Sequence, residues 1–171
     1  MAPNPFPSDD IIVSEVTHAL DNALRHAEEN YLQSKKTSKQ EWIAKQLLTG
    51  LQNKAKNLEF DVLNIPENKK KNWLYDLIWK GRSPNDDPLL VAECNLGKNF
   101  RDIRNDFEKM LMARAELRLL ITYGGNDQKD SEKALENIER LKTQIPGTDH
   151  FLFATIIDDS KGGKIFRYDY V

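Results

Sequence analysis

The stretch WLYDLIWKGRSPNDDPLLVAEC, residues Trp73–Cys94, decides the fold. Its first seven residues, WLYDLIW, are rich in aromatic and branched side chains, which is typical of a β-strand over Trp73–Trp79. Its last six residues, LLVAEC, predict a second, largely buried strand over Leu89–Cys94. Glycine and two prolines break the chain between them, so we predict an antiparallel hairpin with a wide loop.

Helical and strand patterns continue on both sides of this hairpin. Upstream, apolar residues at helical spacing predict a helix over about 10–33. A second helix should begin after Ser38, with Glu41 completing a capping box and Gly50 inside the helix. A weak strand, FDVLNI, should follow that helix. Downstream we predict a helix over Phe100–Glu116, a strand over Leu117–Thr122, a helix over 130–143, a strand over Phe151–Ile157, and a closing hairpin through SKGG and KIFRYDYV.

This order of elements indicates an α/β (α+β) fold with a central mixed β-sheet flanked by helices. The 171 residues are enough for one domain. No apolar run approaches the ~18 residues of a membrane span, and the first residues do not resemble a signal peptide. Cys94 is the single cysteine, which excludes an internal disulfide and a cysteine-only metal site. We therefore expect a cytoplasmic protein without membrane contact.

The net charge of -2 conceals a basic segment. Residues 1–34 carry a net charge of -5, residues 35–82 carry +6, and residues 83–171 carry -3. The total excludes a uniformly basic nucleic-acid coat and a strongly acidic nucleic-acid mimic. The basic segment could bind a phosphate backbone, or it could be a solvated helix face and a loop.

Two acidic residues stand inside the two apolar strands of the hairpin. Carboxylates are depleted in strands, and an acid within so apolar a run is costly unless it has a partner. If the strands are neighbours, Asp76 and Glu93 can meet at one edge of the sheet. Two such carboxylates suit Mg²⁺, which is the arrangement for metal-assisted phosphodiester hydrolysis. The alternative is one solvent-facing acid and one buried salt bridge.

The chain from about residue 41 to 122 resembles the PD-(D/E)XK nuclease superfamily, which has the restriction-endonuclease-like fold. That family carries an Asp on its second strand and Glu-x-Lys on its third, and YDLIW and AECN supply Asp76 and Glu93. Asn95 stands in place of the motif lysine. Some members carry the lysine on the following helix instead, which points to Lys109, with Lys98 behind it. Lys109 could also be a surface lysine paired with Asp102, Asp106 or Glu116.

The resemblance implies a single restriction-endonuclease-like domain over 1–171. Its core would span about 38–157, and the helix over about 10–33 and the last hairpin would be additions. It implies a Mg²⁺- or Mn²⁺-dependent nuclease that prefers DNA to RNA. Asp76, Glu93 and the backbone carbonyl of Cys94 would hold the metal.

The remaining roles also follow from the resemblance. Glu41 would add a carboxylate, and Lys109 or Asn95 would contact the phosphate or the attacking water. The residues expected to grip nucleic acid are Lys69, Lys70, Lys71, Lys80, Arg82 and Lys98. The alternatives are a catalytically inactive module that binds nucleic acid or a protein, and a subunit that acts as a homodimer or with a protein partner.

Overall fold

A computed structural model of the chain describes residues 9–33, 37–64, 75–81, 83, 85, 87–97, 99–147, 149–159 and 161–171. The helices are α1 (Asp9–Asn30), followed by a short 3-10 turn (Tyr31–Gln33), α2 (Lys39–Asn57), α3 (Phe100–Leu111) and α4 (Gln128–Lys142). The strands are β1 (Asp61–Asn64), β2 (Leu77–Lys80), β3 (Leu90–Asn95), β4 (Leu117–Tyr123), β5 (Phe151–Asp158) and β6 (Lys164–Tyr170).

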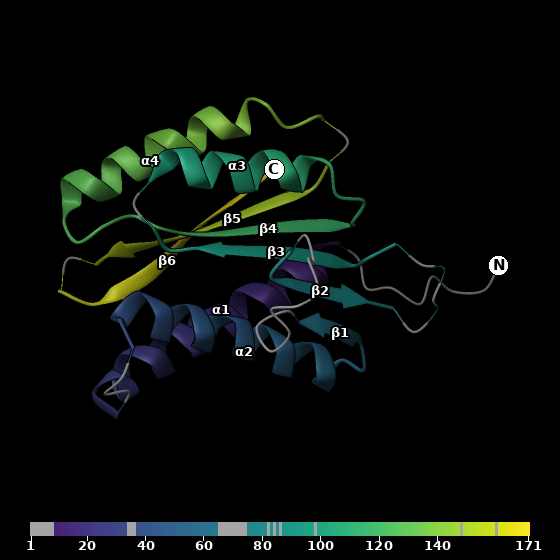
Figure 1. Ribbon diagram of the computed structural model, residues 1–171, viewed down its shortest axis with the longest axis horizontal. Coiled ribbons are helices and arrows are strands. Elements are labelled where there is room, and N and C mark those ends of the chain that lie inside the picture. Colours follow the sequence, from purple (N-terminus) through teal and green to yellow (C-terminus); the bar gives the residue numbers. More distant parts are fainter. Residues whose placement is uncertain are drawn as a thin grey trace.

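The six strands form one sheet in the order β1-β2-β3-β4-β5-β6, as they occur in the chain. The pairs β1–β2, β2–β3 and β5–β6 are antiparallel, whereas β3–β4 and β4–β5 are parallel. The parallel strands are connected through α3 and α4, because a parallel pair needs a crossover. Figure 1 shows α3 and α4 on one face of the sheet and α1 and α2 on the other. The predicted fold class, a mixed sheet flanked by helices, is confirmed.

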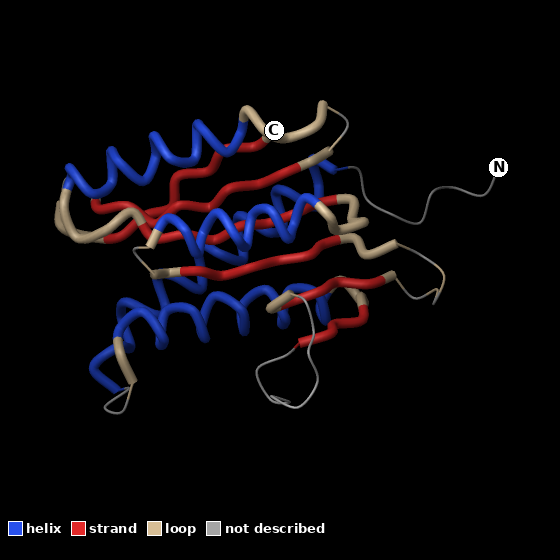
Figure 2. Tube along the Cα trace, turned by 45° about the horizontal axis from the view of Figure 1, so that its top comes forward, coloured by secondary structure: helices blue, strands red, loops and turns tan. Residues whose placement is uncertain are grey.

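The alternating strand pattern divides the interior into two cores. One core lies between the sheet and the α1–α2 pair, and the other lies between the sheet and the α3–α4 pair. Along β3, Leu90 and Ala92 face the first core and Val91 faces the second. Figure 2 shows the strands as a layer with helices on either side. Because each face of the sheet is covered, the central strands are mainly apolar on both faces.

The start and the packing of α2 follow from particular residues. Ser38 accepts a hydrogen bond from the Glu41 backbone N–H, and the Glu41 carboxylate accepts one from Ser38, so the predicted capping box is confirmed. Gly50 lies where α2 crosses α1, and a Cβ atom there would come within 2.8 Å of the Ala23 Cβ. The glycine that weakens the helix thus lets the two helices approach closely.

Two predicted elements are longer than the observed ones. The strand predicted over Trp73–Trp79 begins only at Leu77, and its first two residues lie outside the described part of the chain. The helix predicted to reach Glu116 ends at Leu111. The side chain of Arg118, on β4, donates to the Met110 carbonyl in the last turn of this helix and to the Ala113 carbonyl just beyond it. A local pattern could not place this contact.

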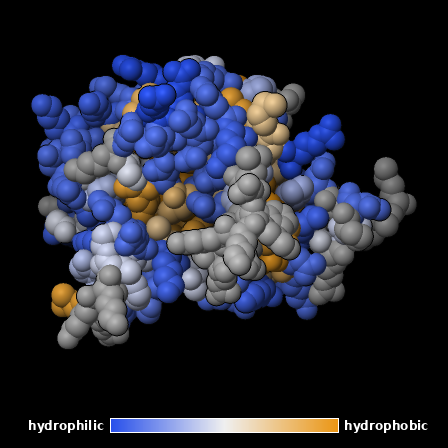
Figure 3. All heavy atoms as spheres, in the orientation of Figure 1, coloured by the Kyte–Doolittle hydropathy of each residue, from blue (hydrophilic) through white to orange (hydrophobic). Residues whose placement is uncertain are grey.

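Within the described residues, no helix is both long and apolar enough to cross a membrane. The view in Figure 3 shows a mainly hydrophilic surface, with apolar side chains visible near the middle of this face.

Candidate functional site

Asp76 and Glu93 lie close together where β2 begins and β3 approaches its end. The β2–β3 register ends with Leu77 opposite Ala92, so Asp76 and Glu93 are the next residue of each strand, and the charge of Asp76 acts on Glu93. The backbone N–H of Asp76 donates to the Ala92 carbonyl at 3.1 Å. One carboxylate oxygen of Asp76 accepts a hydrogen bond from the Cys94 backbone N–H at 2.9 Å. Asp76 therefore lies just ahead of the strand, and its side chain contributes to the pairing with β3.

Lys109 reaches this pair from α3. Its ammonium group forms an ion pair with the Glu93 carboxylate, and it lies 3.5 Å from a carboxylate oxygen of Asp106, one turn earlier on the same helix. Asn95 donates a hydrogen bond to the other oxygen of Asp106 at 2.7 Å. The Tyr75 ring lies beneath the lysine, with 5.8 Å between the ammonium nitrogen and the ring centroid.

Burial and a neighbouring like charge both disfavour the ionised form of Glu93 in this cluster. Glu93 is only 5% exposed, and burial together with the nearby Asp76 carboxylate raises the pKa of Glu93 to about 8. Lys109 opposes this rise but does not cancel it. Burial alone would lower the pKa of Lys109, but its bonds to Glu93 and Asp106 raise that pKa above the ordinary value. The lysine therefore stays charged, while Glu93 takes up a proton readily near neutral pH.

The donor set is suited to a hard divalent cation. Lys109 contacts the carboxylates of Glu93 and Asp106, and Asp76 adds a third carboxylate beside Glu93, so the fully ionised cluster carries two excess negative charges. Within the described residues, no three histidine, cysteine, aspartate or glutamate side chains are arranged to hold a metal ion. Mg²⁺ needs fewer protein ligands, since one or two carboxylates with water and substrate phosphate are usual. The carboxylates of Asp76 and Glu93 fit this requirement.

Other predicted site residues lie apart from the cluster or outside the described residues. The Glu41 carboxylate is used in the α2 capping box, and α2 packs on the opposite face of the sheet. The side chain of Cys94 is half-buried and faces the α1–α2 core, and burial raises the pKa of its thiol. Lys80 ends β2, where it pairs with Asp61 across the ladder. The other five basic residues predicted to grip nucleic acid fall outside the described part of the chain: Lys69, Lys70, Lys71, Arg82 and Lys98.

Two members of the cluster were missing from the predicted site. The sequence indicates Asp106 only as one partner of a surface Lys109, although its position one turn before Lys109 places both on one side of α3. Tyr75 precedes Asp76 directly, and its ring supports the lysine from the sheet side. The three-residue spacing between Asp106 and Lys109 could have indicated their ion pair. Nothing in the sequence indicated that the Tyr75 ring contacts Lys109.

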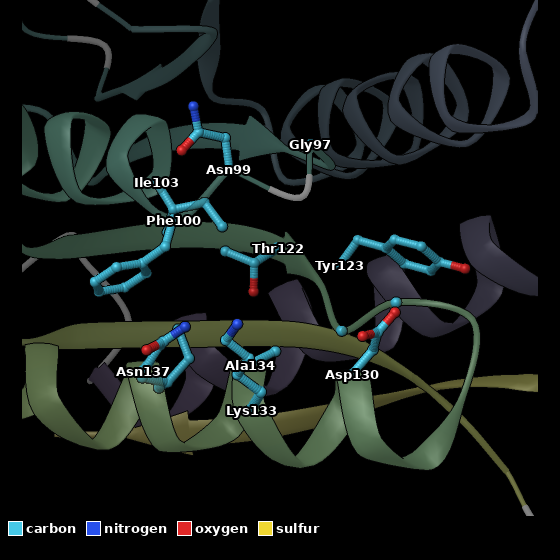
Figure 4. A pocket seen from close by; sticks show the side chains of 13 residues that line it. Gly97, Asn99, Phe100, Ile103, Thr122, Tyr123, Asp130, Lys133, Ala134 and Asn137 are labelled. Atoms are coloured by element: carbon cyan, nitrogen blue, oxygen red, sulfur yellow. The ribbon is translucent and has the colours of Figure 1, made fainter.

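A separate cavity lies between α3 and α4, at the carboxyl ends of β3 and β4. It encloses about 260 Å³. Figure 4 shows Asn99, Phe100 and Ile103 on one side and Lys133, Ala134 and Asn137 of α4 on the other, with Thr122 of β4 between them. Gly125, with a φ of +99°, makes the tight turn that closes one end of the cavity. The cavity contains none of the residues of the carboxylate cluster.

No protein-family model matches this chain, and neither do any curated proteins or solved structures. The candidate site therefore depends on the geometry of this chain alone.

Proposed function

We propose that this protein is a Mg²⁺-dependent nuclease that hydrolyses phosphodiester bonds, with DNA preferred to RNA. The observation that carries the proposal is the meeting of Asp76 and Glu93 on adjacent strands with Lys109 bound to Glu93. The order α2, three antiparallel strands, α3 and a parallel β4 supports a PD-(D/E)XK type of domain. We also propose that the protein is cytoplasmic, and the free, half-buried Cys94 is consistent with such a reducing compartment.

Each residue of the cluster has a role in this proposal. Asp76 and Glu93 would hold Mg²⁺, with the Cys94 carbonyl as a further ligand. When bound, Mg²⁺ would stabilise charge on the phosphate and lower the pKa of a bound water. Lys109 would move its ammonium group from Glu93 toward the phosphate, and Asp106 would keep the lysine charged and in place. Asn95 orients Asp106 through its hydrogen bond.

The raised pKa of Glu93 sets the pH dependence of this site. The carboxylate must lose its proton to bind a cation, so metal affinity should increase as the pH approaches about 8. Nuclease activity should rise over the same interval for the same reason. A substrate phosphate brings further negative charge, which Lys109 is placed to balance.

The test is cleavage of single- and double-stranded DNA and RNA by the full chain with Mg²⁺ or Mn²⁺ at pH 8.5. Asp76→Asn and Glu93→Gln should each reduce cleavage by about 100-fold or more. Glu15→Gln is the matched control, since Glu15 is also ion-paired with a lysine, Lys54, at 2.7 Å on α1 and α2. Absence of cleavage on all of these substrates, or full activity of both site variants, would contradict the proposal.

One observation favours a second candidate function. Lys109 forms an ion pair with Glu93, so the acid has a partner from within the chain. This is what a catalytically inactive module for nucleic acid or a protein partner would need to retain the fold. That module should bind its partner in the presence of EDTA, and its binding should tolerate Glu93→Gln. The nuclease should lose metal binding with the same substitution.

A further inference from the structure

The cavity between α3 and α4 has an apolar wall on each helix. Phe100 and Ile103 line it from α3, and Ala134 and Ile138 line it from α4. Phe100 packs against the second core but is only half-buried, so part of its ring stays uncovered. The volume of about 260 Å³ lies just below that of pockets for drug-sized molecules. The cavity therefore suits a smaller molecule with an apolar body.

Three hydrogen-bond donors from two elements meet in the same cavity. Figure 4 shows the Lys133 ammonium group and the Asn137 amide directed from α4 into the cavity, and the Thr122 hydroxyl directed from β4 toward α4. Lys133 is exposed, so it lies at the mouth. Within the described part of the chain, neither Lys133 nor Asn137 forms a side-chain hydrogen bond or an ion pair. Both donors are therefore available to a bound molecule.

The Thr122 hydroxyl adds a buried donor. Thr122 is 2% exposed, and its oxygen lies 3.1 Å from the hydroxyl oxygen of Thr155. Two hydroxyl groups carry two protons, and the bond between them uses one. Among the described residues, no acceptor is found for the second proton. Thr122 lines the cavity and Thr155 does not, so an acceptor in the cavity can take this proton and relieve the cost of leaving it unpaired.

The charges of the lining favour a ligand with a single negative charge. One of the three donors is a cation, and hydrogen bonds between a cation and an anionic acceptor are stronger than neutral ones. Asp130 brings a carboxylate to the end of the cavity near Gly125, away from Phe100 (Figure 4). With one cation and one anion in its lining, the cavity suits a monoanion better than a dianion such as phosphate.

We propose that this cavity binds a small aromatic monocarboxylate. Its carboxylate accepts hydrogen bonds from Lys133, Asn137 and Thr122. Its ring packs between the helices against Phe100 and Ile138, where an aromatic ring gains both apolar burial and a ring-to-ring contact. The cavity shares no residue with the carboxylate cluster, so this site does not depend on the proposed nuclease function.

Calorimetric titration of the full chain with 3-phenylpropanoate at pH 7 tests the proposal. For a probe of this size we expect a dissociation constant of about 0.1–1 mM. The uncharged amide, 3-phenylpropanamide, has nearly the same shape and should bind at least about tenfold more weakly. Inorganic phosphate should not compete. Absence of binding up to about 10 mM, equal binding of the amide, or displacement by phosphate would overturn the proposal.

Two lysines of α4 provide a matched pair of variants. Lys133→Met removes the charge at the mouth but keeps the length of the side chain, and it should weaken binding of 3-phenylpropanoate at least about tenfold. Lys129→Met makes the same change at an exposed position in the first turn of α4 that does not line the cavity. It should leave the dissociation constant unchanged. Equal weakening by both variants would mean that net charge alone attracts the probe, contrary to the proposal.

The location of the probe can be tested with and without a substitution. Ala134→Phe places a ring in the cavity and should abolish binding, with circular dichroism to check that this variant folds. In the unmodified chain, 3-phenylpropanoate should shift the backbone amide NMR signals of Gly124, Gly125 and Asn137 most, because these residues line the cavity. The signal of Cys94, beside the carboxylate cluster, should not move. The largest shifts at Cys94, or full binding by a folded Ala134→Phe variant, would refute the site.

Discussion

Glu93 and Arg118 are buried charges on neighbouring parallel strands, and the protein holds them in opposite ways. They are 5% and 6% exposed, and both face α3. Arg118 donates to the carbonyls of Met110 and Ala113, with a contact of 2.6 Å to the latter, and lies 3.5 Å from Asp149. Each of these partners is an acceptor or an acid, so the charge of Arg118 is fully balanced.

The surroundings of Glu93 include like charge as well as a partner. Lys109 binds it, but Asp76 and Asp106 add two further carboxylates. A balanced buried charge such as Arg118 contributes to the structure, here by fixing the end of α3. A buried acid kept beside other acids instead leaves an excess of negative charge, which favours a site for a cation. Three substitutions and the addition of a divalent cation test this contrast.

The largest expected effect is on Arg118. Arg118→Met should reduce the free energy of unfolding by about 3–5 kcal/mol, because it leaves the Ala113 and Met110 carbonyls and Asp149 without their buried partner. Urea denaturation at pH 7 measures the loss. Arg114→Met removes an exposed arginine from the loop that precedes β4 and is the control. A loss below about 1 kcal/mol would show that Arg118 is not a balanced structural charge.

Glu93→Gln should increase the free energy of unfolding rather than reduce it, and the increase should depend on pH. Glu93 has a folded pKa of about 8 against an ordinary 4.5, so its contribution to stability is complete below pH 4.5 and is lost as the pH rises through 8. Glutamine is uncharged at every pH and so resembles the protonated form of Glu93. The variant should match the wild type at pH 4.5 and exceed it by about 2 kcal/mol at pH 9.

Denaturation curves at several pH values check this difference. Glu15→Gln should show the reverse trend, because Lys54 lowers the pKa of Glu15 and its stabilising effect is present at high pH. A Glu93→Gln variant less stable than the wild type at pH 9 would mean that the Lys109 pair outweighs the burial of charge.

A divalent cation should have a smaller effect than either substitution. Addition of 10 mM Mn²⁺ should raise the free energy of unfolding by about 1 kcal/mol at pH 8.5 and by much less at pH 6, where Glu93 holds a proton. The increase should vanish in Asp76→Asn and Glu93→Gln. Thermal unfolding with and without the ion measures it, and an equal response in these variants would remove the cluster as a cation site.

The smallest effect is expected at Asp149. Asp149→Asn should reduce the free energy of unfolding by about 0.5 kcal/mol, since the carboxylate is partly exposed and 3.5 Å from Arg118. Asparagine preserves the shape and an acceptor oxygen. If Asp149→Asn lost as much stability as Arg118→Met, the ion pair with Asp149, and not the carbonyls at the end of α3, would be the main partner of the Arg118 charge.

Local patterns predicted the elements well where neighbours in sequence decide the structure. Ser38 and Glu41 define the start of α2 through their own side chains. The run Leu117–Thr122 is buried on both faces and therefore forms a central strand. Asp76 is different, because a strand was predicted through it. Its backbone N–H binds the Ala92 carbonyl, but its side chain, rather than a backbone carbonyl, accepts the hydrogen bond from the Cys94 N–H. Whether the strand includes Asp76 therefore depends on contacts with the neighbouring strand β3, which are distant in sequence.

The candidate site was predictable in part. Spacing indicated that Asp76 and Glu93 could meet, and the resemblance pointed to Lys109 as the relocated lysine. The rotation of α3 about its axis, which brings Lys109 and Asp106 over β3, depends on packing in the second core and on Arg118. Those contacts join residues distant in sequence, and no short pattern contains them. The role of Glu41 followed from the family and not from its own surroundings, and the structure places its carboxylate in a helix cap.

The glycine at position 50 has a consequence far from its own helix. Because Gly50 lacks a side chain, α1 rests directly on α2, with Ala23 at the contact. The same helix holds β6 through Thr17 and Asp21 and covers one end of its edge through Glu28. A larger residue at position 50 would act as a wedge, lifting α1 and shifting the strand that it supports. The spacing of two helices on one face thus sets the alignment of the sheet's last strand.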